Sequence, residues 1–124
     1  MTKRSLISVV DDDESVRESL PDLVRELGYE AQAFSSGEEF LESEFVGTTD
    51  CLIMDVMMTG ISGLDVQKEL KRRGSKIPVV FITAHKDETV RPRVISQGAV
   101  ECLFKPFSDT ALQIALKAAF RLNE

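Results

Sequence analysis

Residues 9–16, "VVDDDESV", place three consecutive aspartates directly after a short apolar run, and this junction decides how the chain is organised. The apolar run Leu6–Val10 is typical of a buried strand. Beyond the aspartates, apolar residues recur at the spacing of one helix face, and Gly28 follows them where a helix commonly ends. The stretch therefore predicts a strand, an acidic turn and a helix. Because neighbouring like charges repel, the aspartates need a cation, a helix end or water to take up their charge.

The same alternation of strand and helix continues along the whole chain. Ser36 with Glu39 matches a capping box, and Ser62 is a suitable N-cap for a helix that ends near Gly74. Five such units without a repeat or a linker predict one α/β domain, with a parallel sheet covered by helices on both faces. The further predicted strands are residues 31–34, 51–54, 79–83 and 100–104, and the last helix is 108–122.

Two prolines bear on the predicted helices. Pro21 falls inside the first helix, where it lacks the N–H of the helical hydrogen bond. It lies off the leucine stripe of that helix, which predicts a position facing solvent. Pro92 is expected in the first turn of a short fourth helix over residues 92–97, because a helix tolerates proline there. Residues 84–91 would then form a long loop.

Size and charge limit the classes of protein that fit. The chain has 124 residues, 43% of them hydrophobic and 29% charged, which is typical of a single globular domain over residues 1–124. The net charge of −6 argues against direct nucleic-acid binding by this domain and against binding to anionic membranes. No apolar run is long enough to cross a bilayer. Cys51 and Cys102 lie in apolar runs without metal-ligand spacing, which favours buried, reduced thiols in a cytoplasmic protein.

Polar residues with related chemistry stand where four of the predicted strands end. Because ligands bind beyond the carboxyl ends of strands in open parallel sheets, these side chains should share one edge. Carboxylate oxygens without nitrogen or sulfur ligands suit a hard cation such as Mg²⁺, which also neutralises phosphate oxygens. A carboxylate held in such a place is a nucleophile towards phosphorus. The residues are Asp11 and Asp12 after the first strand, Asp55 after the third, Thr83 at the end of the fourth and Lys105 after the fifth.

In this order, the residues resemble the receiver domain of two-component response regulators. The stretches that carry the resemblance are "VVDDDESVRESL", "LIMDVMM", "VVFITAH" and "GAVECLFKPF", and it covers essentially all 124 residues. The last stretch leans towards the FixJ-like branch, whose receivers usually precede a helix-turn-helix transcription-factor domain. The resemblance implies a CheY-like, doubly wound (βα)5 sandwich of the flavodoxin-like class, with a five-stranded parallel sheet in the order 2-1-3-4-5.

The resemblance also implies the chemistry of the sheet edge. Asp55 would be the phosphoacceptor, and Thr83 and Lys105 would bind the phosphoryl group. The Lys105–Pro106 bond is expected to be cis. Mg²⁺ would be the cofactor, with Mn²⁺ or Ca²⁺ as substitutes. Its ligands would be Asp11, Asp12, Asp55 and the backbone carbonyl of Met57.

Not every residue of the acidic turn belongs to this set. Asp13, with Glu14, is expected to cap the first helix, because acids favour the positive end of a helix dipole. His85, the only histidine, is expected to be a loop residue at the mouth of the site.

Three positions depart from the family pattern. Thr59 stands where the family usually has proline, which predicts a looser loop after Asp55. Cys102 stands where many receivers carry a Tyr or Phe that swings inward, so we expect no large aromatic switch. Met57 places an apolar side chain at the mouth of the site. Since it cannot position a hydrolytic water, we expect a long-lived aspartyl phosphate.

Three functions are compatible with these residues. The first is a phosphoacceptor signalling domain, not an enzyme in the ordinary sense. A sensor histidine kinase would phosphorylate Asp55, and the face formed by the fourth helix, fifth strand and fifth helix would change its affinity for partners, with transcription as the output. This domain would self-phosphorylate from small phosphodonors and dephosphorylate slowly. A homodimer through the same face and a C-terminal DNA-binding domain are further family expectations.

The other two functions lack this switch. One is a degenerate receiver that acts only as a protein-binding module. The other is a phosphatase of the haloacid dehalogenase type, since residues 55–59, "DVMMT", resemble its D-x-D-x-T motif. In that motif the second Asp is the general acid, and Met57 stands in its place. Phosphorylation by a small phosphodonor separates the three.

Overall fold

The computed structural model describes residues 4–84 and 87–121. In these ranges five strands alternate with five α-helices, and one short 3₁₀ helix precedes the third strand. The strands are β1 (Leu6–Val10), β2 (Glu30–Phe34), β3 (Cys51–Asp55), β4 (Val79–Thr83) and β5 (Glu101–Phe104). The helices are α1 (Glu14–Glu26), α2 (Gly37–Glu42), η1 (Glu44–Gly47), α3 (Gly63–Arg72), α4 (Val90–Ser96) and α5 (Asp109–Arg121).

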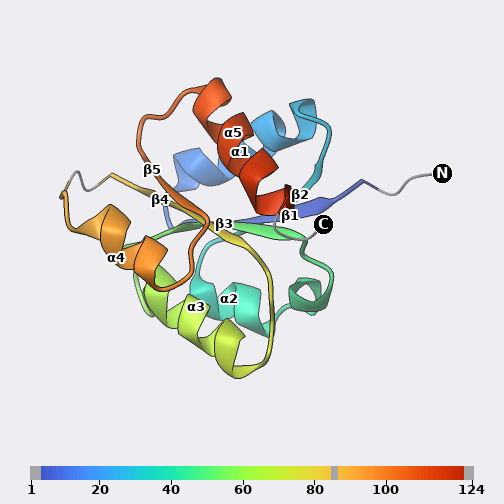
Figure 1. The fold of residues 1–124 in the computed structure, drawn as a ribbon. Coiled ribbons are helices and arrows are strands. Elements are labelled where there is room, and N and C mark those ends of the chain that lie inside the picture. The colour runs from blue at the N-terminus through green and yellow to red at the C-terminus, as the bar shows by residue number, and fades with distance from the viewer. Residues whose placement is uncertain (1–3, 85–86, 122–124) are drawn as a thin grey trace.

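The strands form one parallel sheet in the order β2-β1-β3-β4-β5, which confirms the predicted topology. Helices α1 and α5 cover one face, and α2 and α3 cover the other (Figure 1). Chain order reverses between β1 and β3, and the helices that follow these two strands lie on opposite faces. A parallel sheet opens a crevice at this point, beyond the carboxyl ends of its strands.

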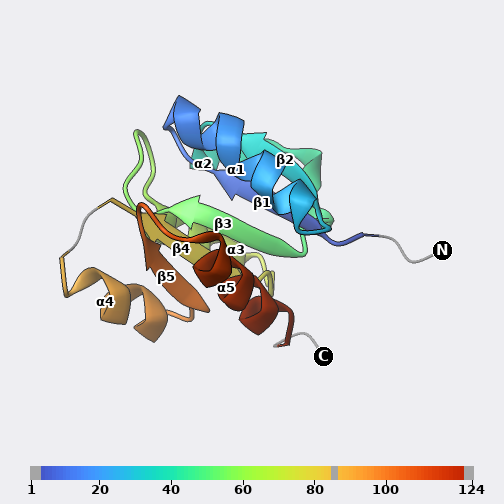
Figure 2. The ribbon, with the colours of Figure 1, turned by 90° about the horizontal axis from the view of Figure 1, so that it is seen from above.

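Side chains of the strands alternate between two apolar cores, one on each face of the sheet. Ile53 of β3 packs in the core with Val24 of α1 and Leu112 of α5. Its neighbour Met54 packs in the other core, with Phe40 of α2 among its members. Seen from above, α1 lies over β1 and β2 while α5 lies towards β4 and β5 (Figure 2). Burial on both faces explains why β1, β3 and β4 have apolar residues at nearly every position.

Two helix starts were predicted from the sequence and are confirmed. Asp13 is the N-cap of α1: its carboxylate accepts hydrogen bonds from the backbone N–H of Ser15 at 2.9 Å and from the Ser15 hydroxyl at 2.7 Å. Ser62 is the N-cap of α3, where it forms a complete capping box with Asp65. These bonds satisfy N–H groups that have no partner inside the helix.

The capping box predicted at α2 is only half formed. Ser36 is the N-cap, and its hydroxyl accepts a hydrogen bond from the backbone N–H of Glu39 at 3.0 Å. The Glu39 carboxylate, however, accepts a hydrogen bond from the Ser35 hydroxyl at 2.8 Å. The adjacent serine therefore provides the donor that the box would have taken from the backbone of Ser36.

The predicted solvent-facing position of Pro21 is wrong. Pro21 is buried together with Leu20 and Val24, and α1 continues past it to Glu26. The helix lies over both β1 and β2, so its buried arc is wider than the stripe marked by its leucines. Leu23, by contrast, is only half-buried.

Helix α4 begins two residues before the predicted start. Pro92 lies in the first turn as expected, but the helix spans Val90–Ser96, so the preceding loop is shorter than residues 84–91. Proline fits the third position because the first four N–H groups of a helix have no intrahelical acceptor.

None of the helices within the described ranges combines the length and apolarity needed to span a bilayer.

Candidate functional site

Three carboxylates meet at the carboxyl edge of the sheet. Asp11 and Asp12 directly follow β1, and Asp55 is the last residue of β3. One carboxylate oxygen from each lies within 4.8 Å of the others. Asp11 is completely buried and Asp55 is 7% exposed, whereas Asp12 is exposed. The site is therefore anchored in the core on one side and open to solvent on the other.

A single ammonium group joins the two buried carboxylates. Lys105 follows β5, and its Nζ donates hydrogen bonds to Asp11 Oδ2 at 2.8 Å and to Asp55 Oδ2 at 3.0 Å. The Lys105 backbone N–H donates to the carbonyl of Thr83 at 2.8 Å, which fixes the end of β5 beside the end of β4. The Lys105–Pro106 peptide bond is cis, as predicted. The structure thus brings together the side chains of Asp11, Asp12, Asp55 and Lys105, and the Thr83 backbone lies beside them through its bond to Lys105.

Burial and charge act in opposite directions on the ionisable groups. Burial raises the pKa of the Asp55 carboxyl; the hydrogen bond from Lys105 lowers it, the nearby Asp11 charge raises it again, and the balance is a raised pKa. Burial alone would lower the pKa of Lys105, but its hydrogen bonds to Asp11 and Asp55 outweigh that effect and raise it. One ammonium against three carboxylates leaves the site negative overall, which favours a bound cation.

Hydrogen bonds also fix the other oxygens of the buried pair. Asp11 Oδ1 accepts from the backbone N–H of Asp13 at 2.9 Å, and Asp55 Oδ1 accepts from the N–H of Met57 at 3.1 Å. The guanidinium of Arg17 donates to the carbonyl of Asp11 at 3.0 Å. Among the described residues, each of the two buried carboxylates therefore accepts a hydrogen bond on both of its oxygens.

Asp12 has a partner that was missed in the sequence. The backbone N–H and the hydroxyl of Thr59 both donate to Asp12 Oδ2, at 2.9 and 3.0 Å. The loop after Asp55 was expected to be looser because of Thr59, but it is tied to the β1–α1 turn by that residue. A single threonine in a loop belongs to no periodic pattern that would predict this contact. The one hint in the sequence is that Thr59 replaces the proline common in the family at this position, and proline has no N–H to donate.

Close packing fixes the backbone of Asp55. Gly63, the first residue of α3, donates its N–H to the carbonyl of Val56 at 2.9 Å. A Cβ at Gly63 would lie 2.4 Å from the Asp55 carbonyl oxygen and 2.8 Å from Phe81 Cε1. Only glycine lets α3 start this close to β3, so this small residue helps position the carboxylate.

The donor set fits a hard divalent cation. Every candidate ligand side chain is a carboxylate, and the three carboxylates are close enough to share one ion. Mg²⁺ commonly takes one or two protein carboxylates and keeps several waters, which an open site with one exposed aspartate allows. The Met57 carbonyl was the fourth predicted ligand, and Met57 lies in the loop directly after Asp55, with its side chain 58% exposed.

A cavity of about 430 Å³ is lined by residues of the loop after β3 and of α4. Thr83, at the end of β4, is fully buried and lines it together with Met57 and residues of α4 that include Val90 and Arg93. The expectation for His85 lies outside the described residues. Cys102 is buried at 3% exposure in the core on the α2 and α3 side.

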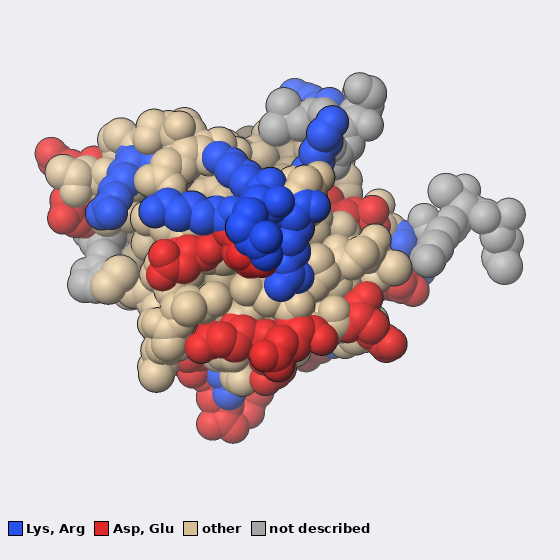
Figure 3. Space-filling model, turned by 90° about the horizontal axis from the view of Figure 1, so that it is seen from below, with Lys and Arg blue, Asp and Glu red and all other residues tan. Residues whose placement is uncertain are grey.

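Charged side chains also cluster elsewhere on the surface, but they do not converge on one point as the residues of the acidic site do. Seen from below, Lys and Arg side chains cluster over α3, next to acidic side chains of α2 (Figure 3). The net charge of −6 therefore does not describe every face. Exposed basic residues of α3 and the turn after it are Lys68, Lys71, Arg72 and Arg73.

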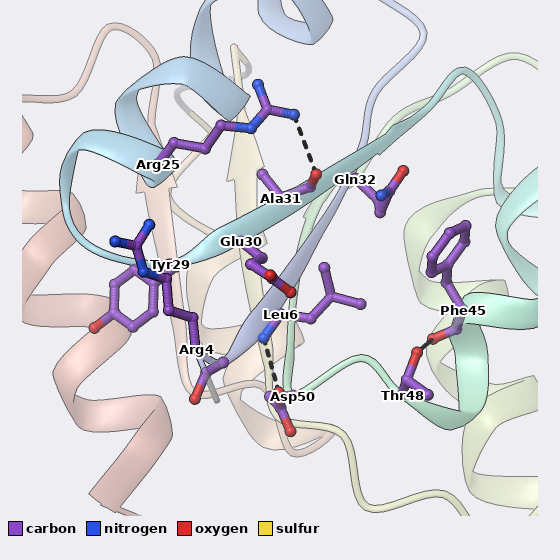
Figure 4. Close-up of a pocket in the computed structure, with 11 residues that line it drawn as sticks. Arg4, Leu6, Arg25, Tyr29, Glu30, Ala31, Gln32, Phe45, Thr48 and Asp50 are labelled. Atoms are coloured by element: carbon purple, nitrogen blue, oxygen red, sulfur yellow. Dashed lines mark hydrogen bonds between the residues drawn. The ribbon is translucent and has the colours of Figure 1, made fainter. Parts of the chain in front are cut away.

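A larger cavity, of about 820 Å³, lies at the amino ends of β1 and β2, at the opposite edge of the sheet (Figure 4). Two of its charged groups already bond to the chain. Asp50 accepts from the backbone N–H of Leu6 at 2.8 Å, and Arg25 donates to the carbonyl of Ala31 at 3.2 Å. These bonds stabilise the strand ends, and we therefore assign the cavity no chemistry.

Several known proteins are similar to this chain in sequence. Residues 7–117 match the family model of the response regulator receiver domain. Nodulation protein W of Bradyrhizobium diazoefficiens is 45% identical over 94% of this chain and 51% of its own length. Response regulator protein TodT of Pseudomonas putida is 42% identical over 97% of this chain and 53% of its own. The transcriptional regulatory protein FixJ of Azorhizobium caulinodans is 37% identical over 91% and 54%.

Two solved structures are also similar to this chain. The low-resolution structure of response regulator StyR has a TM-score of 0.88 and 41% identity, and the match covers 97% of this chain and 61% of that one. The crystal structure of FixJ-N has a TM-score of 0.84 and 30% identity over 95% and 94% of the two chains. This chain spans about half the length of the relatives that it matches in sequence.

Proposed function

This chain belongs to the family of response regulator receiver domains of two-component systems, and from that premise we propose that it accepts one phosphoryl group on the carboxylate of Asp55. The donor would be a sensor histidine kinase or a small phosphodonor. The observation that carries the proposal is the convergence of three carboxylates and one ammonium at a single sheet edge, with Lys105 bonded to both Asp11 and Asp55.

In the proposed reaction, an oxygen of Asp55 attacks the phosphorus of the donor. A new O–P bond forms as the bond from phosphorus to the leaving nitrogen or oxygen breaks, and the leaving group keeps that electron pair. Lys105, already 3.0 Å from Asp55 Oδ2, would follow the charge onto the phosphoryl oxygens. The Thr83 hydroxyl would donate a hydrogen bond to one of them.

Asp11, Asp12, Asp55 and the Met57 carbonyl would hold Mg²⁺, or Mn²⁺ or Ca²⁺ in its place. The bound ion would supply charge neutralisation for the phosphoryl oxygens. Asp12, as the exposed member of the cluster, would be the ligand that an incoming cation meets first. Asp11 and Asp55 would be the buried carboxylate ligands, and Lys105 would bond to the phosphoryl group.

The proposed output is a change at the α4-β5-α5 face. Thr83 directly precedes the segment that leads into α4, so a bond from Thr83 to the phosphoryl group would pull on that helix. The named relatives include transcriptional regulatory proteins, and this chain matches only part of their length. By analogy, we propose a transcriptional output through a DNA-binding domain beyond this segment and dimerisation through the same face. A single receiver unit over residues 1–124 and a cytoplasmic location remain predictions.

Incubation with acetyl phosphate and Mg²⁺, followed by intact mass measurement, tests the proposal. We expect one added phosphoryl group on the wild type, none in excess EDTA, and none on Asp55→Asn. No adduct on a folded, Mg²⁺-binding wild type would leave a binding-only module. Steady turnover of phosphate esters without a stable adduct would instead favour the phosphatase.

A further inference from the structure

We infer that Thr59 is a positioning residue for the divalent cation: it holds one oxygen of Asp12, and the other oxygen would remain available as a metal ligand. The inference rests on the proposed function, because it concerns the same metal site. It assigns a role to a loop residue that is outside the set of carboxylates, threonine and lysine described above.

The contact is double and joins distant parts of the chain. Thr59 donates from its backbone N–H at 2.9 Å and from its hydroxyl at 3.0 Å, and both bonds end on Asp12 Oδ2. The two residues are 47 positions apart, so the contact connects the loop after β3 to the turn after β1. Two donors on one oxygen restrict rotation of the Asp12 carboxylate more than a single exposed hydrogen bond would.

The three carboxylates differ in how many of their oxygens already accept hydrogen bonds. Both oxygens of Asp11 accept hydrogen bonds, and so do both oxygens of Asp55. Asp12 is the member of the cluster with one oxygen, Oδ1, that accepts no hydrogen bond from the described residues. That oxygen is a ready ligand, and the Thr59 contact orients it without occupying it.

The physical consequence is a higher affinity for the cation. A ligand carboxylate that is already oriented loses less conformational freedom when it binds a metal, and hydrogen bonds to the non-ligating oxygen hold that orientation. Removing such a partner typically weakens metal binding by about 10- to 100-fold. Because Asp12 is exposed, we expect the lower end of this range or less.

The side chains available at this position separate the two donors. Thr59→Ser keeps both the N–H and the hydroxyl, Thr59→Val keeps the shape and the N–H, and Thr59→Pro removes both donors. Calorimetric titration of the metal-free wild type and variants with MgCl₂ measures Kd directly. We expect Ser within about twofold of the wild type, Val weaker by about 3- to 10-fold, and Pro weaker still. Asp12→Asn is the reference for loss of the ligand itself.

Melting temperatures in EDTA distinguish positioning from simple bracing of the loop. If Thr59 only stabilised the loop, Thr59→Val would melt earlier in EDTA and bind Mg²⁺ with unchanged Kd, and this would overturn the inference. Should Thr59→Pro fail to fold, the comparison of Val with Ser still decides. Absence of Mg²⁺ binding by the folded wild type would overturn the proposed function and the inference together, whereas an unchanged Kd in Thr59→Val overturns the inference alone.

Discussion

The Nζ atom of Lys105 lies 3.0 Å from Asp55 Oδ2, and the same ammonium lies 2.8 Å from Asp11 Oδ2. Lys105 comes from the end of β5, and two strands, β3 and β4, separate β5 from β1, whose following turn carries Asp11; this contact therefore connects the sheet across its functional edge. Lys105 thus does what a bound cation would also do: it holds two buried carboxylates together.

Replacement of Lys105 by methionine should therefore destabilise the metal-free protein. Removing one partner of a buried ion pair typically costs about 3–5 kcal/mol, because the remaining charge is left uncompensated. Mg²⁺ should restore part of the loss, so the rise in melting temperature on adding Mg²⁺ should be larger for Lys105→Met than for the wild type. Lys117→Met, on the exposed side of α5, is the control. An equal Mg²⁺ response in wild type and Lys105→Met would contradict the arrangement.

The acidic turn should separate into two roles on mutation. Asp13→Ala removes the cap of α1 and should lower the melting temperature by a few degrees while phosphorylation persists. Asp12→Ala should abolish Mg²⁺-dependent phosphorylation with little effect on melting in EDTA. Thermal melts and intact mass after acetyl phosphate treatment check both variants. Equal loss of phosphorylation in the two would show that the triplet is divided wrongly.

Gly63→Ala should damage both stability and the site. The added Cβ would lie 2.4 Å from the Asp55 carbonyl oxygen, so backbone must move, and overpacking of this kind costs about 1–3 kcal/mol. Because the displaced backbone carries the proposed phosphoacceptor, phosphorylation should also slow. Gly47→Ala is the matched control, since a Cβ there would meet nothing within 4 Å. Urea melts of both variants check the result; similar losses in the two would argue against close packing at Gly63.

Both cysteines should resist thiol reagents while the protein is folded. Burial raises the pKa of Cys51 to about 12 and that of Cys102 to about 11, so at mildly alkaline pH almost no reactive thiolate is present. A chromogenic aromatic disulfide should react slowly with the native protein and rapidly with two thiols per chain in guanidinium. Rapid native reaction of Cys102 would show that β5 is more accessible than its 3% exposure indicates.

The exposed Met57 side chain leads to a prediction about lifetime. An apolar group at the mouth of the site cannot orient a water for attack on the phosphoryl group, so the aspartyl phosphate should persist for minutes rather than seconds in Mg²⁺. Met57→Gln, which offers an amide to water, should shorten the lifetime. Decay of the phosphorylated mass after removal of acetyl phosphate measures it, and decay within seconds in the wild type would refute the prediction.

The sequence predicted the strand ends well because the apolar pattern of a strand stops there and the pattern of a helix follows. Apolar runs stop at Val10, Thr83 and Phe104, and the polar residues at or after these stops lie at one edge once the sheet is parallel. Asp13 and Ser62 were also predictable, since a helix cap depends on residues within one turn.

The features that were missed depend on neighbours distant in the sequence or on competition nearby. Pro21 is buried because α1 covers two strands, which a helical wheel does not contain. Glu39 bonds to Ser35, a competing donor that the capping motif ignores. Thr59 contacts a residue 47 positions away, and no local pattern encodes such a pair. In each case the sequence predicted the helix or loop but not the residues that contact it.

The central claim is that Asp55 carries the phosphoryl group, and locating that group tests it most directly. After treatment with acetyl phosphate and Mg²⁺, borohydride reduction converts an aspartyl phosphate to homoserine, and peptide mass spectrometry then identifies the modified residue. We predict homoserine at position 55, only in samples that received both phosphodonor and Mg²⁺. Homoserine at position 11 or 12 in the wild type, or a phosphoryl adduct without any modification at 55, would contradict the claim.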